Sequence, residues 1–391
     1  MAELYQVLRV DHVLGFFRIW EIPRHTCVRG MLGHYFPSTP LSVDELRSWG
    51  LPDIDRYIKP YVRFHILQDK FKGEAQSVAD KYFNARHIVE NDDYYDFKPE
   101  YDNEVKIQAS LKDLPEEKRN HYRACLFQLL ANVLLIEDPE QKGFYQLRTE
   151  LKVDHIDETK YGPVEYSSSS WMELNDYQRS QFEKLYLDFV YKRQTWNWVQ
   201  KANSKLEMLN NSTDMLICAE DLGQLTEGIL HALKEHGLLS LRVQRMSKDP
   251  SDAFDNVDQF PYLSVCCPST HDSSSLRGWW EENRPVTEKY WNQILWRHDA
   301  CPEQCTPEIS EMIIKKHLWS KSMWAIFLLQ DLTGITPHLA QLQTPEEERI
   351  NIPSDPEHKW RYRFPYKFED LENDEEFTSH LYEMVKDSHR I

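Results

Sequence analysis

Short apolar runs and amphipathic segments follow one another in the second half of the chain. Residues 225–237 have the apolar spacing of a helix, with Thr226 placed to cap it and Gly237 to end it. Short apolar runs stand before and after this helix, at 214–221, 238–246, 262–270 and 323–332. Runs that are apolar on both faces predict parallel strands, and the segments between them predict helices that cover the sheet. The pattern does not separate an open sheet from a closed barrel.

A strand is also predicted at residues 4–10, directly before Asp11. Residues 29–51 then predict a loop followed by a helix, with Ser42 and Glu45 at the spacing of a capping box.

Residues 51–200 differ, because charged residues dominate and apolar residues recur at helical spacing. Two helical segments are predicted, at 114–141 with Pro115 in its first turn and at 176–202. The polar stretch 152–171 between them predicts a mobile loop. In the first segment, one helical face carries Leu126, Leu129, Leu130, Val133 and Leu134.

The composition describes a folded chain with an acidic balance. The 391 residues are 41% hydrophobic and 13% aromatic, and the formal net charge is −18. This charge argues against duplex nucleic acid or an anionic membrane as the main partner. No apolar run of about 18 residues predicts a membrane span. The N-terminal residues lack the pattern of a signal peptide, and we therefore expect a cytoplasmic protein.

The seven cysteines are scattered along the chain. Cys301 and Cys305 form a CxxxC motif without a matching second pair, and Cys266 adjoins Cys267 on a predicted strand. A zinc site is one interpretation, and free thiols in a reducing compartment are the better one. We expect no metal and no cofactor.

Acidic residues follow three of the predicted strands. Arg9 and Asp11 share one side of their strand, so the guanidinium is expected to keep the carboxylate ionised. The alternative is a purely structural ion pair. Glu220, followed by Asp221, comes directly after the run 214–221, where the alternative is a helix N-terminus capped by acids.

The third acid is Asp272, which follows His271 after the strand predicted at 262–270. Its alternative is also a helix cap, with Asp272 or Ser273 opening a helix that continues through Trp279.

Together the three acids indicate a catalytic site. The carboxyl ends of parallel strands open onto one face, where α/β enzymes place their sites. Three carboxyl groups at one face cannot all ionise cheaply, so one is expected to keep its proton and act as an acid. An ionised carboxylate beside a protonated one is the equipment for glycoside cleavage with retention, in which the pair stands roughly 5–5.5 Å apart. No phosphate loop, zinc-protease motif or serine-hydrolase motif competes.

Five runs, in order along the chain, resemble the 4-α-glucanotransferases of glycoside hydrolase family 77, also called amylomaltases or disproportionating enzymes. They are "LRVDHVLGFFRIWEIP", "ICAEDLG" followed by "GLLSLRVQRM", "PSTHDSSSLRGWW", "LLQDLTG" and "RINIPSDPEHKWRYRF". Because 209 residues separate Asp11 from Glu220, the chain is most similar to the plant and protist cytosolic branch, which carries a long insertion there.

The resemblance implies a role for each matching residue. Asp11 would be the nucleophile, Glu220 the general acid and base, and Asp272 the stabiliser of the transition state. Four residues would orient the nucleophile or bind the sugar: Arg9, His12, His271 and Asn351. The implied partners are maltose as glucosyl donor and an α-glucan or heteroglycan as acceptor. Aromatic platforms would favour a sugar acceptor over water. The candidates nearest to these motifs are Trp20, Trp279 and Trp280, and the better alternative for each is a position in the core.

The resemblance also implies an α/β fold of a particular kind: the C-terminal portion of a (β/α)8 TIM barrel, about strands 4–8, with a large helical insertion. Residues 1–50 would begin the barrel portion, 51–200 would form the insertion, and 201–391 would supply the remaining strands and helices. The family's first three barrel strands would then be missing, and we expect the chain alone to fold poorly and to have little activity. An α-glucan hydrolase and a glucan-binding fragment without turnover remain alternatives.

Overall fold

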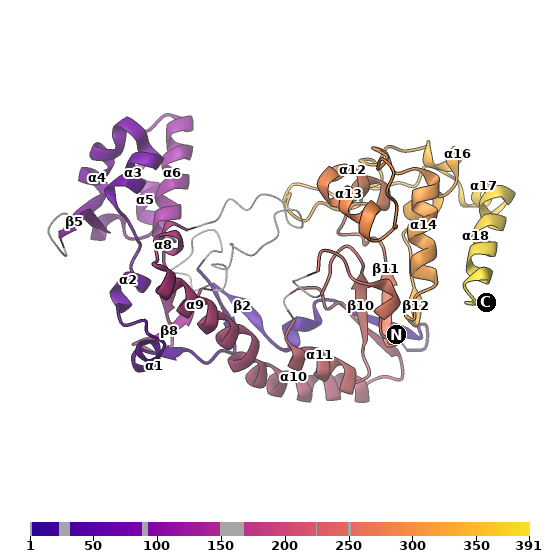
Figure 1. Cartoon of the computed structure of the whole chain (residues 1–391), viewed down its shortest axis with the longest axis horizontal. Helices are drawn as coiled ribbons and strands as arrows, with labels where there is room; N and C mark the ends of the chain where they lie inside the picture. The colour runs from indigo at the N-terminus through magenta and orange to yellow at the C-terminus, as the bar shows by residue number, and fades with distance from the viewer. Residues whose placement is uncertain (1, 23–31, 88–92, 149–167, 224, 249–251) are drawn as a thin grey trace. The chain divides into compact units, whose positions relative to one another are not determined.

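The computed structural model describes residues 2–22, 32–87, 93–148, 168–223, 225–248 and 252–391. The chain forms two compact units, which are described separately (Figure 1). The first unit contains residues 1–13, 205–225 and 230–391, and the second contains residues 14–204 and 226–229. No helix within the described ranges is both long enough and apolar enough to cross a membrane.

The first unit is built on five strands and the helices that follow them. Its strands are β1 (Val7–Val10), β9 (Leu216–Ala219), β10 (Leu239–Val243), β11 (Ser264–Cys267) and β12 (Trp324–Ala325). Its helices are α11 (Glu227–Glu235, whose first residues belong to the second unit), η7 (Val257–Gln259), α12 (Leu276–Glu282), α13 (Arg284–Gln293), α14 (Pro307–Leu318), α15 (Leu329–Thr333), α16 (Pro337–Ala340), α17 (Phe368–Glu372) and α18 (Glu375–Asp387).

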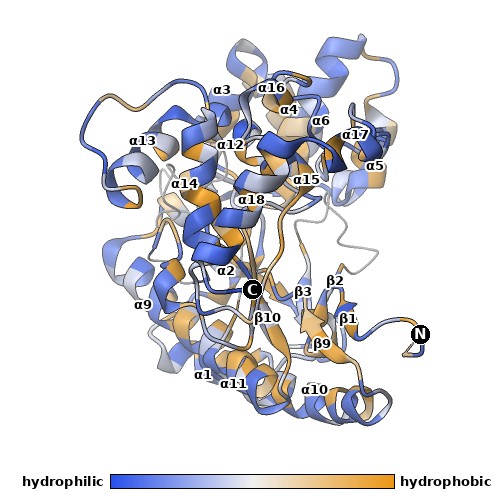
Figure 2. Cartoon of the chain, turned by 90° about the vertical axis from the view of Figure 1, so that its right-hand side faces the viewer, coloured by the Kyte–Doolittle hydropathy of each residue, from blue (hydrophilic) through white to orange (hydrophobic). Residues whose placement is uncertain are grey.

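The five strands form one sheet in the order β1-β9-β10-β11-β12, and every neighbouring pair is parallel. Figure 2 shows the apolar colour of β9 and β10 and the two-coloured, amphipathic helices α11 and α14. Thr226 Oγ1 accepts the Ile229 N–H at the start of α11, and Gly237 has the positive φ of +69° that ends it. The parallel sheet and this helix were predicted from the sequence, and both are confirmed.

The predicted strand at 323–332 is mostly wrong. Only Trp324 and Ala325 pair with β11, and α15 begins at Leu329. The residues after Ala325 are apolar because they are needed for packing: Phe327 and Leu332 pack against a core cluster of this unit although neither is in a strand. A short apolar run does not distinguish a buried strand from a buried helix by its pattern alone.

The core of the first unit surrounds Trp280, Tyr290 and Trp291, which are all buried. His317 of α14 is also completely buried, and its Nδ1 lies 2.8 Å from the Ile313 carbonyl oxygen. Burial lowers the pKa of His317 from 6.5 to about 4. The folded chain therefore keeps this imidazole neutral at a pH at which the unfolded chain would protonate it.

This difference predicts an acid-sensitive contribution to stability. Below about pH 6.5 the unfolded state binds a proton at His317 and the folded state does not, so stability falls as the pH falls towards 4. We expect His317→Gln to lose this dependence. Between pH 7 and pH 5, the unfolding free energy of the parent minus that of the variant should fall by about 2 kcal/mol. Urea denaturation of both chains at the two pH values measures it, and a constant difference would contradict the assignment.

The second unit combines helices with three small antiparallel sheets. Its strands are β2 (Ile19–Glu21), β3 (His34–Phe36), β4 (Leu41–Ser42), β5 (Phe83–His87), β6 (Asp93–Phe97), β7 (Leu135–Glu137) and β8 (Phe144–Leu147). Its helices are η1 (Val13–Phe16), α1 (Val43–Ser48), α2 (Ile54–Ile58), α3 (Phe64–Phe71), η3 (Lys72–Glu74), α4 (Ala75–Tyr82), η4 (Pro99–Tyr101), α5 (Glu104–Ser110), α6 (Glu116–Leu130), α8 (Ser169–Met172), α9 (Asp176–Asp188), the π-helical η6 (Phe189–Arg193) and α10 (Gln194–Asn211, which ends in the first unit).

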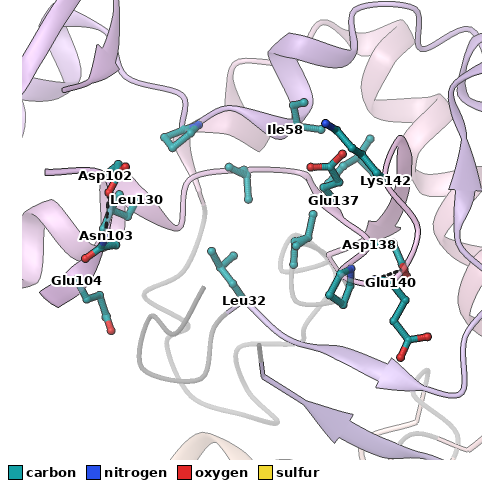
Figure 3. A pocket seen from close by; sticks show the side chains of 15 residues that line it. Leu32, Ile58, Asp102, Asn103, Glu104, Leu130, Glu137, Asp138, Glu140 and Lys142 are labelled. Atoms are coloured by element: carbon teal, nitrogen blue, oxygen red, sulfur yellow. Dashed lines mark hydrogen bonds between the residues drawn. The ribbon is translucent and has the colours of Figure 1, made fainter. Parts of the chain in front are cut away.

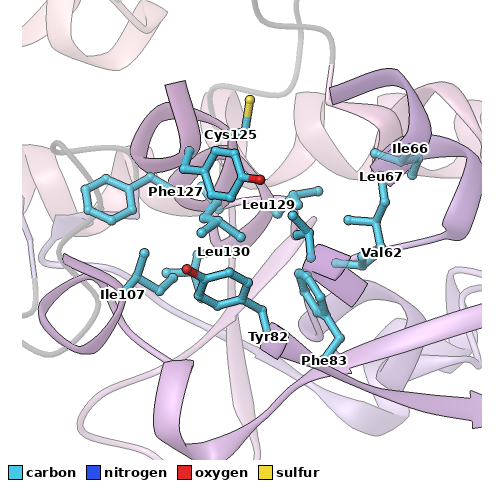
Figure 4. Packing of buried hydrophobic residues seen from close by; sticks show 14 of the residues in the cluster. Val62, Ile66, Leu67, Tyr82, Phe83, Ile107, Cys125, Phe127, Leu129 and Leu130 are labelled. Carbon is cyan, nitrogen blue, oxygen red and sulfur yellow. The ribbon is translucent and has the colours of Figure 1, made fainter. Parts of the chain in front are cut away.

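Among the described residues of the second unit, two large apolar clusters stand out. One gathers α3, α4, α5 and α6 around Leu129 and Leu130 (Figure 4). The other joins Leu41 and Leu46, from the first fifty residues, to Leu185 of α9. Residues on both sides of position 50 therefore share one core.

The predicted helix at 114–141 is shorter than expected. Pro115 stands at the N-cap position of α6, one residue before the first turn in which it was predicted. Leu126, Leu129 and Leu130 are buried on the helix, but it ends at Leu130. Just beyond this end, the Asn132 amide donates to the Tyr61 carbonyl at 2.6 Å and accepts from Ser170 N at 3.0 Å. These two buried bonds fix a turn where the apolar pattern alone continues a helix.

The structure also bears on the other elements predicted in this unit. Ser42 Oγ accepts the Glu45 N–H, as the capping box predicts. The Glu45 carboxylate pairs with Arg193 and is not the group that binds the Ser42 N–H. The segment predicted at 176–202 is helical and passes through the π-helical η6. The loop predicted at 152–171 lies outside the described residues up to 167, and for its last residues the prediction is wrong, because Ser168 caps α8, which begins at Ser169.

Candidate active site

Asp11 and Glu220 follow directly on paired strand ends. Val10 and Ala219 are register partners at the carboxyl ends of β1 and β9, so the two acids are the next residues on neighbouring parallel strands. Backbone hydrogen bonds continue the pairing past the strands, from Glu220 N to the Val10 carbonyl at 2.9 Å and from Val13 N to the Glu220 carbonyl at 3.0 Å. The sequence expectation that strand ends bring these acids together agrees with this geometry.

The Glu220 carboxylate joins the two turns. Its Oε2 accepts the His12 N–H at 3.1 Å, and its Oε1 accepts the Leu222 N–H at 2.9 Å. His12 has a φ of +47°, a left-handed conformation that a non-glycine residue keeps only where its surroundings hold it. The carboxylate is therefore oriented by the backbone beside the nucleophile candidate.

Arg9 and Asp11 form the predicted ion pair, with 2.9 Å between Arg9 Nη2 and Asp11 Oδ1. The Asp11 side chain is 79% exposed and that of Arg9 46% exposed. An ion pair so open to water contributes at most about 1 kcal/mol to stability. A structural role alone therefore explains this pair poorly, whereas an exposed, oriented carboxylate is available to a ligand.

Asp272 lies in the loop that follows β11, half-exposed, between two polar neighbours. Its Oδ2 is 3.2 Å from His271 Nε2, and its Oδ1 accepts from Asn351 Nδ2 at 2.7 Å. Ser275 caps α12 by accepting the Gly278 N–H, so the alternative of a cap at Asp272 or Ser273 is wrong. The structure thus brings three predicted residues, His271, Asp272 and Asn351, into contact.

Asp221 has a structural role that differs from the helix cap considered above. It is fully buried and accepts from Leu241 N at 3.0 Å, from Ser240 Oγ and from the Lys248 ammonium. Burial lowers the pKa of Lys248 to about 8. These bonds tie the end of β9 to β10 and so fix the residue after Glu220.

Buried charges support the loop that carries Asp272. Arg245 Nη2 donates to Ser273 Oγ at 2.7 Å and to the Ser274 carbonyl. Asp331 Oδ1 accepts the Leu276 N–H at 2.7 Å, where the loop enters α12. Burial raises the pKa of Asp331 to about 6, although this N–H and the charge of Arg245 act in the opposite direction.

We expect Arg245→Met to loosen this loop. The substitution removes the Nη2 donor to Ser273 and Ser274 and takes the charge of Arg245 away from the buried Asp331. The unfolding free energy should fall by about 2–4 kcal/mol. Amide hydrogens of residues 270–276 should exchange at least about tenfold faster, as hydrogen–deuterium exchange would measure. Arg297→Met, at an exposed arginine of the same unit, is the control. Equal exchange in both variants would contradict a supporting role.

The three platform candidates were each also open to the alternative of a core position. Trp280 is 1% exposed in the core, so the core alternative is the correct one for it. Trp279 packs against the same core and edge-on to Tyr290, while Trp20 packs edge-on against Tyr35 in the second unit. Sequence reasoning missed Trp360, which is 59% exposed and lies against the His271 ring with 5.4 Å between ring centroids. It stands inside the quoted run "HKWRYRF", but no local pattern marks it as exposed.

The six cysteines in the described ranges are free thiols. Cys301 and Cys305 are buried in the core of the first unit, and burial raises the pKa of Cys305 to about 12. The described part of the chain contains no group of three His, Cys, Asp or Glu side chains arranged to hold a metal ion.

The second unit contains a pocket of about 600 Å³ (Figure 3). Its lining includes the apolar side chains of Ile58, Leu130 and Val133 and the acidic side chains of Glu137 and Glu140. None of the described residues that line it is aromatic, so it lacks the ring faces that usually contact sugars.

Three comparisons place these features among known proteins. The family model of glycoside hydrolase family 77, described as 4-alpha-glucanotransferase, matches residues 1–368. The chain is 37% identical over 397 residues to the 4-alpha-glucanotransferase DPE2 of Oryza sativa subsp. japonica, covering 100% of this chain and 40% of that relative. It is 30% identical over 190 residues to the 4-alpha-glucanotransferase of Chlamydia trachomatis, covering 47% of this chain and 35% of that one.

Two solved structures are also similar in part. The amylomaltase from Streptococcus agalactiae in complex with acarbose matches at a TM-score of 0.36 and 20% identity, over 50% of this chain and 35% of that chain. The amylomaltase from Corynebacterium glutamicum matches at a TM-score of 0.35 and 10% identity, over 89% of this chain and 63% of that chain. By its sequence match, the chain spans about two fifths of the length of its rice relative.

Proposed function

This chain belongs to the 4-alpha-glucanotransferase family, glycoside hydrolase family 77, and we propose that it carries the catalytic acids for retaining transfer of glucosyl units between α-1,4-glucans. Maltose is the proposed donor and a glycogen-like or heteroglycan chain the proposed acceptor, with glucose released. The observation that carries this proposal is the pairing of Val10 with Ala219, which makes Asp11 and Glu220 neighbours.

The first half of the reaction breaks the glycosidic bond. The Asp11 carboxylate attacks the anomeric carbon of the donor and forms a covalent β-glucosyl ester. Glu220 gives its proton to the glycosidic oxygen, and glucose leaves. Arg9, whose Nη2 lies 2.9 Å from Asp11 Oδ1, holds the attacking carboxylate in place.

The second half rebuilds a glycosidic bond. The Glu220 carboxylate takes the proton of an acceptor hydroxyl, and the resulting oxygen attacks the anomeric carbon while Asp11 leaves. Two inversions restore the α configuration. Asp272, with His271 and Asn351 beside it, is proposed to bind sugar hydroxyls and to stabilise the positive charge that develops on the ring. The two carboxyl groups supply every proton transfer, so the proposed mechanism uses no metal or cofactor.

The architecture that goes with this function is also a proposal. The strand order β1-β9-β10-β11-β12 follows the chain order, as successive strands of a (β/α)8 barrel do. We propose that these strands are a barrel portion, that residues 51–200 are an insertion into it, and that the protein works in the cytosol.

A second candidate is a chain that binds glucan without turning it over. The observation that favours it is the coverage of about two fifths of the rice relative, because residues outside this span could contribute to a complete site. A hydrolase that uses water as the acceptor is a third candidate on the same acids.

Glucose release distinguishes these candidates. The purified chain is incubated with maltose, with and without glycogen, and free glucose is followed. Release that depends on glycogen supports the transferase. Glucose release without extension of any acceptor, glycogen or a second maltose, selects the hydrolase. Saturable glucan binding without release selects the binding chain and contradicts the proposed activity of this chain.

A further inference from the structure

The Trp360 indole is a large apolar surface beside the polar cluster of Asp272. It is 59% exposed, and its ring centroid lies 5.4 Å from that of His271, with 47° between the planes. Other tryptophans of this unit are also exposed, Trp296 at 75% and Trp319 at 65%. Exposure alone therefore does not indicate a binding role. Trp360 differs from Trp296 and Trp319 in its contact with His271, beside Asp272.

The segment that presents Trp360 has no helix or strand but is fixed by polar contacts. Asn351 donates to Asp272, and the His358 ring nitrogen Nε2 is 3.0 Å from the Ile350 carbonyl oxygen. On the other side of Trp360, Tyr362 donates its hydroxyl to Gln343 Oε1 at 3.0 Å. The indole thus stands on a segment that is anchored before and after it. The loss of conformational entropy of this segment on ligand binding should therefore be small.

The chemistry of this surface matches a pyranose ring. A glucose unit has apolar C–H faces and a rim of hydroxyl groups. An exposed indole face offers the apolar contact, and a carboxylate, an imidazole and an amide beside it offer hydrogen bonds to the rim. The side chains of Asp272 and His271 are 50% and 34% exposed, so both remain open to such a ligand.

From this juxtaposition we propose that Trp360 is a stacking platform for a glucose unit of an α-glucan bound beside Asp272. The inference rests on the proposed function, since it names a sugar contact of the same site. It makes Trp360 a substrate-binding residue and gives it no part in proton transfer.

The test measures binding separately from turnover. Maltoheptaose is titrated calorimetrically into Asp11→Asn chains that carry Trp360, Trp360→Ala or Trp360→Phe. We expect Ala to weaken binding by about tenfold or more and Phe, which keeps a ring face, to stay within about threefold of the parent. Trp319→Ala is the matched control, because it removes an equally exposed indole elsewhere in the unit, and it should bind as the parent does.

Several results would overturn the platform. They are binding by Trp360→Ala within twofold of the parent, an equal loss in Trp319→Ala, and no saturable binding by the parent. Failure of the proposed function is recognised separately. A chain that binds through Trp360 but releases no glucose from maltose contradicts the transferase and leaves the platform standing. A chain that turns over with the same KM after Trp360→Ala contradicts the platform alone.

Discussion

Asp11→Asn is expected to lower glycogen-dependent glucose release from maltose by about 10⁴-fold or more. The amide has nearly the shape of the carboxylate but cannot attack the anomeric carbon, so no glucosyl ester forms. Because the Asp11 side chain is 79% exposed and its ion pair with Arg9 is open to water, the unfolding free energy should change by less than about 1 kcal/mol. Glucose release and urea denaturation of the same preparation would measure both effects.

A matched control is available in the same chain. Asp44 forms an exposed ion pair with Arg47 at 3.1 Å, and its side chain is 92% exposed. Asp44→Asn therefore makes the same chemical change in a similar setting, and glucose release should not change. The ester itself is detectable, since 5-fluoroglucosyl fluoride should add one sugar to the peptide that contains Asp11. Label on another residue, or full activity in Asp11→Asn, would exclude Asp11 as the nucleophile.

Glu220→Gln is expected to reduce glucose release from maltose by about 10²–10⁴-fold, the usual contribution of a general acid or base. The loss should depend on the substrate, because fluoride leaves without a proton. Glucosyl fluoride should still form the ester on Asp11, and azide, which needs no base, should then accept the glucosyl group. The measurement compares product formation from maltose and from glucosyl fluoride, each with and without azide.

The structure adds a complication to this variant. The Glu220 carboxylate accepts from both His12 N and Leu222 N, whereas an amide has only one oxygen to accept with. One of the two turns will therefore lose a bond. Restoration by azide separates the loss of the acid and base from a displacement of Asp11. A variant with a displaced Asp11 would react slowly with every donor and every acceptor, azide included. A variant that azide does not restore would argue for a positioning role of Glu220.

The sequence predicts the parts of this fold that depend on regular patterns. Parallel strands are easily predicted because they are apolar on both faces. Polar residues at their carboxyl ends then lie together at one edge of the sheet. This reasoning led to Asp11 and Glu220, which the register indeed makes neighbours. Asn351 was named from family resemblance and not from any pattern, and its contact with Asp272, 79 residues away, was not predicted.

The failures share a physical cause, which is that burial is decided by tertiary packing. Trp280 follows the acidic motif in sequence but turns into the core, whereas Trp360 lies in an irregular segment and stays exposed. Ser275, rather than Asp272 or Ser273, caps α12, because Arg245 and Asp331 hold the loop and set the position at which the helix starts. Long-range bonds of this kind leave no local signature.

The bond from His12 N to the Glu220 carboxylate determines how the site responds to thermal motion. Within the described residues β1 pairs only with β9, at one end of the sheet, where strands fluctuate most. Because Glu220 holds the turn after Asp11 with its own side chain, a displacement of β1 that keeps this bond must carry both acids along together. Their separation is then governed by the short turns and by three hydrogen bonds, which are the side-chain bond from His12 N to Glu220 and the backbone bonds from Glu220 N to Val10 and from Val13 N to Glu220. It therefore depends little on motions in the rest of the sheet.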